Sequence, residues 1–374
     1  MRIWFAASPP VTPPYSLRWS MRSLADELRH FGHTVSLIFP RAERPNHPVR
    51  FSWSLAFRLV VLFWKRPQWI ITHSTDGLPC AFFIALFRMK TRIALFTDGW
   101  DIRTIIIERR LPRSLAAVHH PWYRRLLKDF LLRLALHRSA LCICGTFDEL
   151  RWMRKHLISS RGKCIFIPTG VPVRKQPFWP NQEAAPPSFL LTGEYHWKKN
   201  IEYGIELFRR VLAINKAARL FYVGCGQISE KLRQLLYPLG DAVFTVESEA
   251  SAKMYRWYES CPFLLLPSRF EAQRPPVILE AQSRGCIVFA ADIPPVRECL
   301  SHGHTGFLIS GVNPVADANL VQRVIGDHHL IIQVGNAAWK RASRQNIRRQ
   351  GTRLLRVLIR TTVKTLRTTG SRSR

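Results

Sequence analysis

Short, continuous runs of apolar residues recur along this chain, and stretches with helical periodicity lie between many of them. The runs occupy 2–8, 34–40, 68–74, 92–98, 140–146 and 163–170 in the first half, and 188–194, 219–226, 242–246, 262–268, 286–292 and 305–309 in the second. Runs that do not alternate with polar residues are typical of strands buried on both faces. Their alternation with helices predicts parallel sheets with right-handed crossovers, and therefore an α/β fold.

The proline-rich segment 171–188 separates the two series of runs and has the composition of a linker. With 374 residues the chain is too long for one ordinary core. We therefore predict two doubly wound, Rossmann-like domains that face a cleft. The predicted boundaries are an N-terminal domain at 1–175, a linker at 176–187, a second domain at 188–335, and a basic C-terminal helix and tail at 336–374.

The composition narrows the choice of partners and of compartment. A net charge of +31 predicts an anionic partner: nucleic acid, an anionic membrane or a phosphorylated substrate. The cysteines lack framework spacing, and Cys142, Cys144, Cys164 and Cys286 lie in apolar runs, which favours buried thiols in a reducing cytoplasm. The first apolar run is too short for a signal peptide, and no run approaches the ~20 apolar residues of a membrane-spanning helix.

Two glutamates flank the predicted start of a helix that follows the 262–268 run. Glu271 falls in the loop at the carboxyl end of the strand, and Glu280 falls one turn into the helix that Pro275 or Pro276 begins. A helix N-terminus attracts anions, so a diphosphate could rest there with a carboxylate on either side for sugar hydroxyls. The alternative is a cap-region acid at Glu271 and a surface residue at Glu280.

The segment 267–309 resembles the donor-binding segment of the retaining glycosyltransferases of family 4, also called group 1 glycosyltransferases. The residues that carry the resemblance are Ser268, Glu271, Glu280, Gly285, Pro294, Pro295, Glu298, Gly303 and Gly306. The stretches 189–208, 221–235 and 167–171 also resemble family segments. The N-terminal half resembles the family only in its alternation of strand-like runs and helical stretches. The resemblance implies the two-domain GT-B fold and a nucleotide-sugar donor, with an acceptor-side domain at 1–175 and a nucleotide-sugar-binding domain at 188–335.

It also implies roles for individual residues. Glu271 would contact the donor sugar and help to organise the transition state, and Glu280 would accept hydrogen bonds from the ribose. Lys199 would lie against the diphosphate, with Lys198 as its substitute. A fixed cation there stabilises the leaving nucleoside diphosphate more than the ground state, and GT-B enzymes generally need no metal or other cofactor. The predicted donor site is completed by Gly193, Pro276 and Val277.

On the acceptor side, Asp98 is the catalytic candidate, and a turn-forming Asp-Gly pair is its alternative. Further candidates for the cleft are His73, His119 and His120.

The chain departs from the family at several positions. Its two glutamates are one residue further apart than usual, Glu194 replaces an arginine, 8–16 replaces a glycine-rich loop, and Asp98-Gly99 replaces His-Gly. These departures indicate an unusual donor or a reduced activity.

After Asp327 the sequence contains no acidic residue. One helical face of the tail carries Ile347, Leu354, Leu355, Leu358 and Leu366, and the opposite face carries Arg349, Arg353, Arg356, Arg360 and Arg367. This pattern predicts a basic amphipathic helix. Two compatible interpretations stay open: a last helix packed on a domain, or docking on anionic lipid.

The leading hypothesis is a retaining glycosyltransferase, cytoplasmic and peripherally bound to the inner face of the membrane. It would transfer sugar to a lipid-linked or cell-envelope glycan, as in polysaccharide or lipopolysaccharide biosynthesis. The alternatives are a sugar-nucleotide epimerase on the same fold and a non-enzymatic protein that binds polyanions. A nucleic-acid partner is disfavoured because no RNA- or DNA-binding motif appears.

Overall fold

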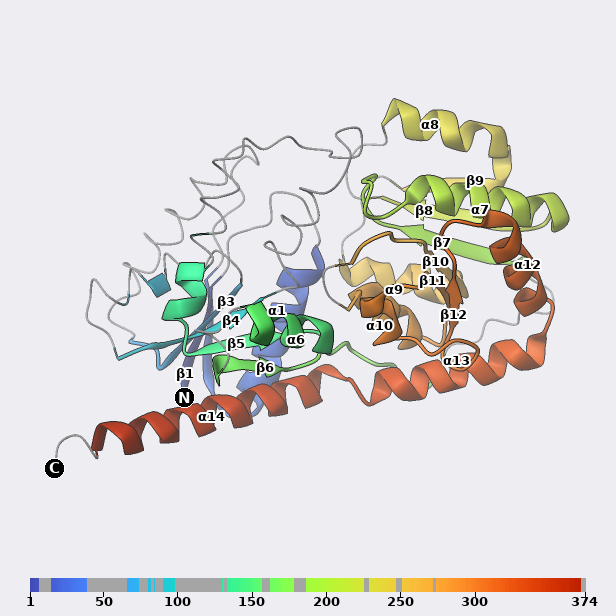
Figure 1. Ribbon diagram of the computed structural model, residues 1–374. Helices are drawn as coiled ribbons and strands as arrows, with labels where there is room; N and C mark the ends of the chain where they lie inside the picture. Colours follow the sequence, from blue (N-terminus) through green and yellow to red (C-terminus); the bar gives the residue numbers. More distant parts are fainter. Residues whose placement is uncertain are drawn as a thin grey trace.

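The computed structural model contains two six-stranded sheets, each parallel throughout (Figure 1). It describes residues 1–6, 15–38, 66–73, 80, 81, 84, 90–97, 130, 133–156, 162–177, 186–224, 229–246, 251–271 and 274–370. Helices connect the strands, so the predicted fold class of two doubly wound, Rossmann-like units is confirmed. We call the unit built on the first sheet the first unit and the one built on the second sheet the second unit.

The first unit has the strand order β2-β1-β3-β4-β5-β6, which is the flavodoxin-like arrangement. Its strands are β1 (Arg2–Ala6), β2 (Thr34–Ile38), β3 (Trp69–His73), β4 (Arg92–Phe96), β5 (Leu141–Cys144) and β6 (Cys164–Phe166). Its described helices include α1 (Tyr15–His30) and α6 (Phe147–His156).

The second unit has the order β12-β11-β10-β7-β8-β9, which is the dinucleotide-fold order read from the other edge. Its strands are β7 (Ser188–Thr192), β8 (Arg219–Val223), β9 (Val243–Val246), β10 (Phe263–Leu266), β11 (Ile287–Ala291) and β12 (Phe307–Ile309). Its helices are α7 (Ile201–Ile214), α8 (Glu230–Leu236), α9 (Ser251–Ser260), α10 (Pro276–Gln282), α11 (Pro294–Arg297), α12 (Pro314–Ile325) and the 3₁₀ turn η4 (Tyr237–Ala242).

In this order the chain reverses its direction of winding between β7 and β10, which are hydrogen-bonded neighbours. Ligands of open α/β sheets bind outside the carboxyl ends of the strands at such a reversal. The loops that follow β7 and β10 are therefore where a site is expected in the second unit.

Both faces of the second sheet are buried, as the continuous apolar runs predicted. In β7, Phe189 and Leu191 join one core cluster with residues of α7 and α12. Leu190 between them joins a cluster on the other face with residues of α9 and α10. Because side chains alternate along a strand, burying both faces requires apolar residues at successive positions.

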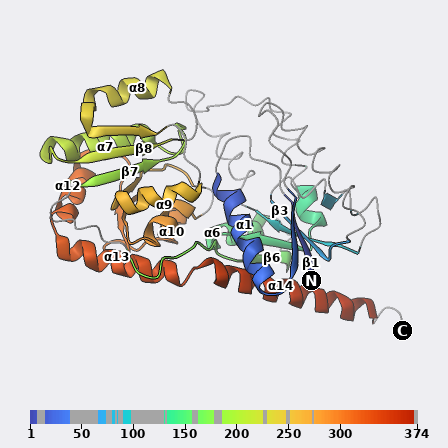
Figure 2. The same ribbon diagram turned by 180° about the vertical axis from the view of Figure 1, so that it is seen from behind.

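Two helices end the chain: α13 (His328–Ser343) and α14 (Ile347–Gly370). Figures 1 and 2 show them along one side of the molecule, with α13 under the second unit and α14 under the first. The predicted domain boundary after Gly335 falls inside α13, where Gly335 is buried instead of ending the helix. The side chains of Leu366 and Arg367 lie outside the described part of α14.

The apolar face of α14 packs on the first unit. Ile347, Leu354 and Leu358 belong to the same core cluster as residues of α1, β1 and β3. The Trp69 indole donates a hydrogen bond of 3.1 Å to the Thr362 hydroxyl. The prediction of a last helix packed on a domain is therefore confirmed, although that domain is the first one.

The cysteines agree with the expectation of buried thiols. All described cysteines are free and buried, including Cys142, Cys144, Cys164 and Cys286. Among the helices of the described ranges, none has both the length and the hydrophobicity to cross a bilayer.

Candidate functional site

The loop after β7 turns sharply at Gly193, whose φ of +133° is in the region that favours glycine. A β-carbon here would also lie 3.4 Å from Cγ of Lys199. At the far end of the loop, Asn200 adopts a left-handed backbone, and its Nδ2 donates to the Pro267 carbonyl at 3.1 Å. These contacts fix the loop beside the end of β10.

The loops after β7 and β10 are joined directly. The Lys198 carbonyl accepts hydrogen bonds from the backbone N–H groups of Arg269 at 2.8 Å and Phe270 at 3.3 Å. Nζ of Lys199 lies 2.6 Å from Oε1 of Glu271, and the two side chains are 28% and 11% exposed. Two residues that the sequence predicted for one site thus form a partly buried ion pair at the reversal of the strand order.

Lys198 has a different environment from Lys199. Its Nζ lies 5.7 Å from the centre of the Trp197 ring and 5.9 Å from that of Phe270, distances at which a cation–π attraction operates. The Lys198 ammonium therefore lies among aromatic rings, whereas Lys199 is held by a carboxylate.

Glu280 is buried in α10, so the alternative interpretation as a surface residue is wrong. The Tyr258 hydroxyl donates a hydrogen bond of 2.9 Å to its Oε2. Burial raises the pKa of Glu280 to about 6, against the opposing effects of the Tyr258 hydrogen bond and the Arg284 charge. Sequence reasoning missed Tyr258, because nothing in α9 marks it as a partner of a residue in the next helix.

The N-terminus of α10 offers fewer donors than the sequence analysis expected. Pro275 is the N-cap and Pro276 the first helical residue, and neither has an N–H group. The N–H of Ile278 donates to the Pro275 carbonyl at 3.1 Å. Two of the first positions of α10 therefore have no N–H group to offer a ligand, and a third N–H is already bonded.

The resemblance also pointed to Ser268 and Glu298. Ser268 is fully buried, and its Oγ has no hydrogen-bond partner among the described residues. The carboxylate of Glu298 instead reaches the first unit, where its Oε2 and Oε1 accept the N–H groups of Phe147 and Asp148, each at 2.9 Å. These N–H groups begin α6, so the carboxylate also faces the positive end of the helix dipole.

The same helix start is capped from within the first unit. Thr146 Oγ1 accepts the N–H of Glu149 at 2.9 Å, and Glu149 Oε2 accepts that of Gly145 at 2.9 Å. This is a variant of the capping box, whose Thr-x-x-Glu spacing is readable in the sequence. The capping box does not engage the N–H groups of Phe147 and Asp148. The Glu298 carboxylate of the second unit accepts both.

Several candidates have no described side chain. Asp98, His119 and His120 lie outside the described residues. His73 ends β3, but its side chain is not among those described. Among the residues that the structure does describe, no three His, Cys, Asp or Glu side chains come together as metal ligands.

Residues 186–327 match the family model described as Glycosyl transferases group 1. An exopolysaccharide phosphotransferase of Streptomyces coelicolor is 25% identical over 197 residues, which are 52% of this chain and 20% of that protein. A D-inositol 3-phosphate glycosyltransferase of Streptomyces bingchenggensis is 33% identical over 88 residues, 24% of this chain and 19% of that protein. An uncharacterized glycosyltransferase of Methanocaldococcus jannaschii is 29% identical over 143 residues, 37% of this chain and 35% of that protein. The chain thus spans well under half the length of these relatives.

Solved structures resemble the chain over nearly its whole length. Sucrose-phosphate synthase from Thermosynechococcus elongatus has a TM-score of 0.73 at 18% identity, and the alignment covers 96% of this chain and 99% of that one. HepE of Anabaena in complex with UDP-glucose has a TM-score of 0.69 at 16% identity, with coverage of 96% and 99%. These structural similarities establish the two-unit GT-B fold of the chain.

Proposed function

We propose that this protein, whose second unit carries a group 1 glycosyltransferase domain, transfers a sugar from a nucleotide-sugar donor with retention of configuration. The proposed acceptor is a lipid-linked or cell-envelope glycan. The observation that carries the proposal is the Lys199–Glu271 pair between the ends of β7 and β10, inside the segment that matches the family model.

The chemistry of such a transfer suits this pair. When the glycosidic bond of the donor breaks, negative charge develops on the leaving diphosphate. A fixed ammonium group at Lys199 stabilises that charge more in the transition state than in the ground state, and it can take the place of a metal ion. The Glu271 carboxylate, held beside it, is placed to face the donor sugar and the positive charge that develops there.

We assign to Glu280 the binding of the ribose of the nucleotide-sugar donor. The hydrogen bond from Tyr258 holds one carboxylate oxygen and leaves Oε1 to accept a hydroxyl group of the ligand. With a pKa of about 6, the carboxyl group is mostly ionised at neutral pH, which favours this accepting role. UDP complexes of structural neighbours such as HepE support a nucleotide-sugar donor.

We assign membrane contact to the outer side of α14. Its exposed residues are Arg348, Arg349, Arg353, Arg356, Ile359, Arg360 and Val363. At ~100° per residue these positions fall within roughly 140° of the helix circumference, opposite the buried leucines. A row of arginines with two exposed apolar side chains, and no acid on the helix, suits an anionic lipid surface.

Asp98 remains our candidate for the catalytic residue on the acceptor side.

A panel of nucleotide sugars, screened for hydrolysis and for transfer to lipid-linked acceptors, tests the activity. Calorimetry then tests the site: Lys199→Ala should weaken binding of the nucleoside diphosphate more than that of the free nucleoside, because a point charge acts on phosphate. Lys216→Ala, an exposed lysine on the same unit, is the matched control. Equal losses for both ligands, or no turnover of any nucleotide sugar, would contradict the proposal.

A further inference from the structure

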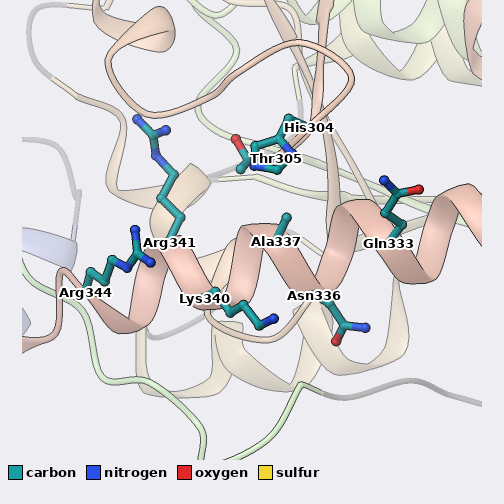
Figure 3. Close-up of a pocket in the computed structure, with 8 residues that line it drawn as sticks. All are labelled: His304, Thr305, Gln333, Asn336, Ala337, Lys340, Arg341 and Arg344. Carbon is teal, nitrogen blue, oxygen red and sulfur yellow. The ribbon is translucent and has the colours of Figure 1, made fainter.

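A pocket lined by several charged and polar residues lies on the flank of the second unit, between α13 and the loop that precedes β12 (Figure 3). Its volume is about 470 Å³. Figure 3 shows Arg341 in the last turn of α13, Arg344 just after it, and His304 and Thr305 in the loop on the side of Ala337. The pocket shares no residue with the loops that hold Lys199, Glu271 and Glu280.

The lining of the pocket is rich in cations. Lys340 and Arg341 lie in the last turn of α13, Arg344 follows as its C-cap, and His304 contributes an imidazole from the loop. Lys340 and Arg344 are exposed, and within the described part of the chain neither side chain has a hydrogen-bond or ion-pair partner. The amides of Gln333 and Asn336 add neutral donors and acceptors.

Arg341 carries a positive charge that is only partly satisfied. Its Nη2 donates to the Glu298 carbonyl at 2.7 Å and its Nη1 to the Ser301 hydroxyl at 3.3 Å, but its buried Nε has no partner among the described residues. The buried Arg274 donates to the same Glu298 carbonyl at 3.2 Å. Burial and, secondarily, the nearby Arg274 charge lower the pKa of Arg341.

Neither Arg274 nor Arg341 has a carboxylate partner among the described residues, because the Glu298 carboxylate is bound to α6. Two desolvated guanidinium groups that share a carbonyl are costly without a counter-charge. An anion in the adjoining pocket would supply that charge.

We propose that this pocket binds a phosphate-bearing anion, separately from the donor. Arg344 and Lys340 would provide charge-assisted hydrogen bonds to the phosphate oxygens, and the amides of Gln333 and Asn336 would contact the rest of the ligand. A phosphomonoester of a small molecule and a phosphate headgroup of a lipid present the same chemistry here.

The position of the pocket also gives such a ligand an effect on the whole molecule. Arg341 holds the backbone of Glu298, and the side chain of Glu298 bridges to the start of α6 in the first unit. A bound anion that neutralises Arg341 would stabilise this bridge. The ligand is therefore expected to strengthen the contact between the two units.

The test uses calorimetry on the full chain with glycerol 3-phosphate, and with glycerol as the uncharged match. The variant Lys340→Gln/Arg344→Gln should raise the Kd for glycerol 3-phosphate about tenfold, since two charge-assisted contacts are lost. Lys216→Gln/Arg233→Gln removes the same two residue types from exposed positions of the second unit and should leave the Kd unchanged. Lys199→Ala should also leave it unchanged.

A second arm uses vesicles of phosphatidylcholine with and without phosphatidic acid. If free glycerol 3-phosphate does not bind, but binding to phosphatidic acid is weakened in the pocket variant and unchanged in the Lys216/Arg233 control, the ligand is a lipid headgroup. The proposal is overturned if the pocket variant matches the wild type for both probes, if neither probe binds, or if Lys199→Ala abolishes phosphate binding while the pocket variant keeps it.

Discussion

The two units have the same architecture but cover their sheets differently. The second unit buries both faces of its sheet with helices that follow its own strands. The first unit covers part of one face with α14, a helix that the chain supplies only after the second unit is complete. The chain at the start of α14 packs closely against Gly170 of the first unit. A β-carbon at Gly170 would lie 2.8 Å from the Asn346 carbonyl oxygen and from Cα of Ile347.

The candidate site and the contacts that stabilise the first unit therefore lie in different parts of the molecule. The ion pair, the buried Glu280 and the family match all lie in the second unit. The first unit depends on the second and on the end of the chain, through α14 and through the Glu298 bridge to α6. Substitutions of the Lys199–Glu271 pair should therefore reduce activity with little change in stability, and substitutions of the buried residues of α14 should do the reverse.

The largest expected effect concerns the chemistry of the second unit. Glu271→Gln should reduce kcat about a thousandfold, because in the proposed reaction the carboxylate faces charge that develops in the transition state. The melting temperature should stay within about 2 °C, because glutamine has the same shape and keeps an oxygen that can accept a hydrogen bond from Lys199. Glu230→Gln, an exposed residue of α8, is the control. Wild-type turnover in Glu271→Gln would remove this residue from the site.

The next effect concerns the first unit. Leu358→Ala should lower the free energy of unfolding by about 3 kcal/mol, because Leu358 is fully buried between α14 and the first unit. The neighbouring Ile359 is 44% exposed, so Ile359→Ala should cost about 0.5 kcal/mol or less. Denaturant titration measures both. Equal losses would mean that α14 is not a structural part of the first unit.

A third prediction tests the buried carboxyl group of Glu280. Its folded pKa of about 6 lies above the ordinary value of 4.5, so the folded state binds the extra proton. Glu280 therefore contributes stability below pH 4.5, and this contribution is lost as the pH rises through about 6. The loss is about 2 kcal/mol. Unfolding measured from pH 4 to pH 8 should show this slope in the wild type and not in Glu280→Gln, whereas parallel curves would contradict it.

A smaller effect is expected where the two units meet. Glu298→Gln removes the negative charge from the N-terminus of α6 and should weaken the bridge by about 1 kcal/mol. Hydrogen exchange should quicken at the N–H groups of Phe147 and Asp148. The N–H of Glu149, which Thr146 holds within the first unit, is the internal control. Unchanged exchange at all three positions would show that the bridge does not form in solution.

The smallest effect concerns the outer side of α14. Arg353→Gln should weaken binding to anionic vesicles by about 1 kcal/mol, and the wild type should dissociate at high salt. Screening shortens the range of the attraction from ~10 Å at 0.1 M salt to ~3 Å at 1 M. Stability should not change, because Arg353 is exposed. Vesicle sedimentation is the measurement, and equal binding to neutral and anionic vesicles would refute lipid docking.

Much of the fold was predictable because strands buried on both faces leave an unmistakable apolar run. Phe189, Leu190 and Leu191 illustrate this, since adjacent positions fill two different core clusters. Lys199 and Glu271 were predicted for one site because the segments that contain them resemble those of group 1 glycosyltransferases. Their 2.6 Å contact was not, because it depends on β7 and β10 being neighbours in a sheet whose order is not the order of the sequence.

The sequence by itself determined the two α/β units, the loops that carry the candidate site and the basic amphipathic last helix, because these follow from local periodicity and residue chemistry. Only the tertiary structure decided that Glu280 is buried against Tyr258, that α14 belongs to the first unit, and that Glu298 bridges to α6. Each of these joins residues far apart in the chain or on different elements. A helical pattern specifies which face of an element is apolar, but the partner of that face is set by how all the elements pack together.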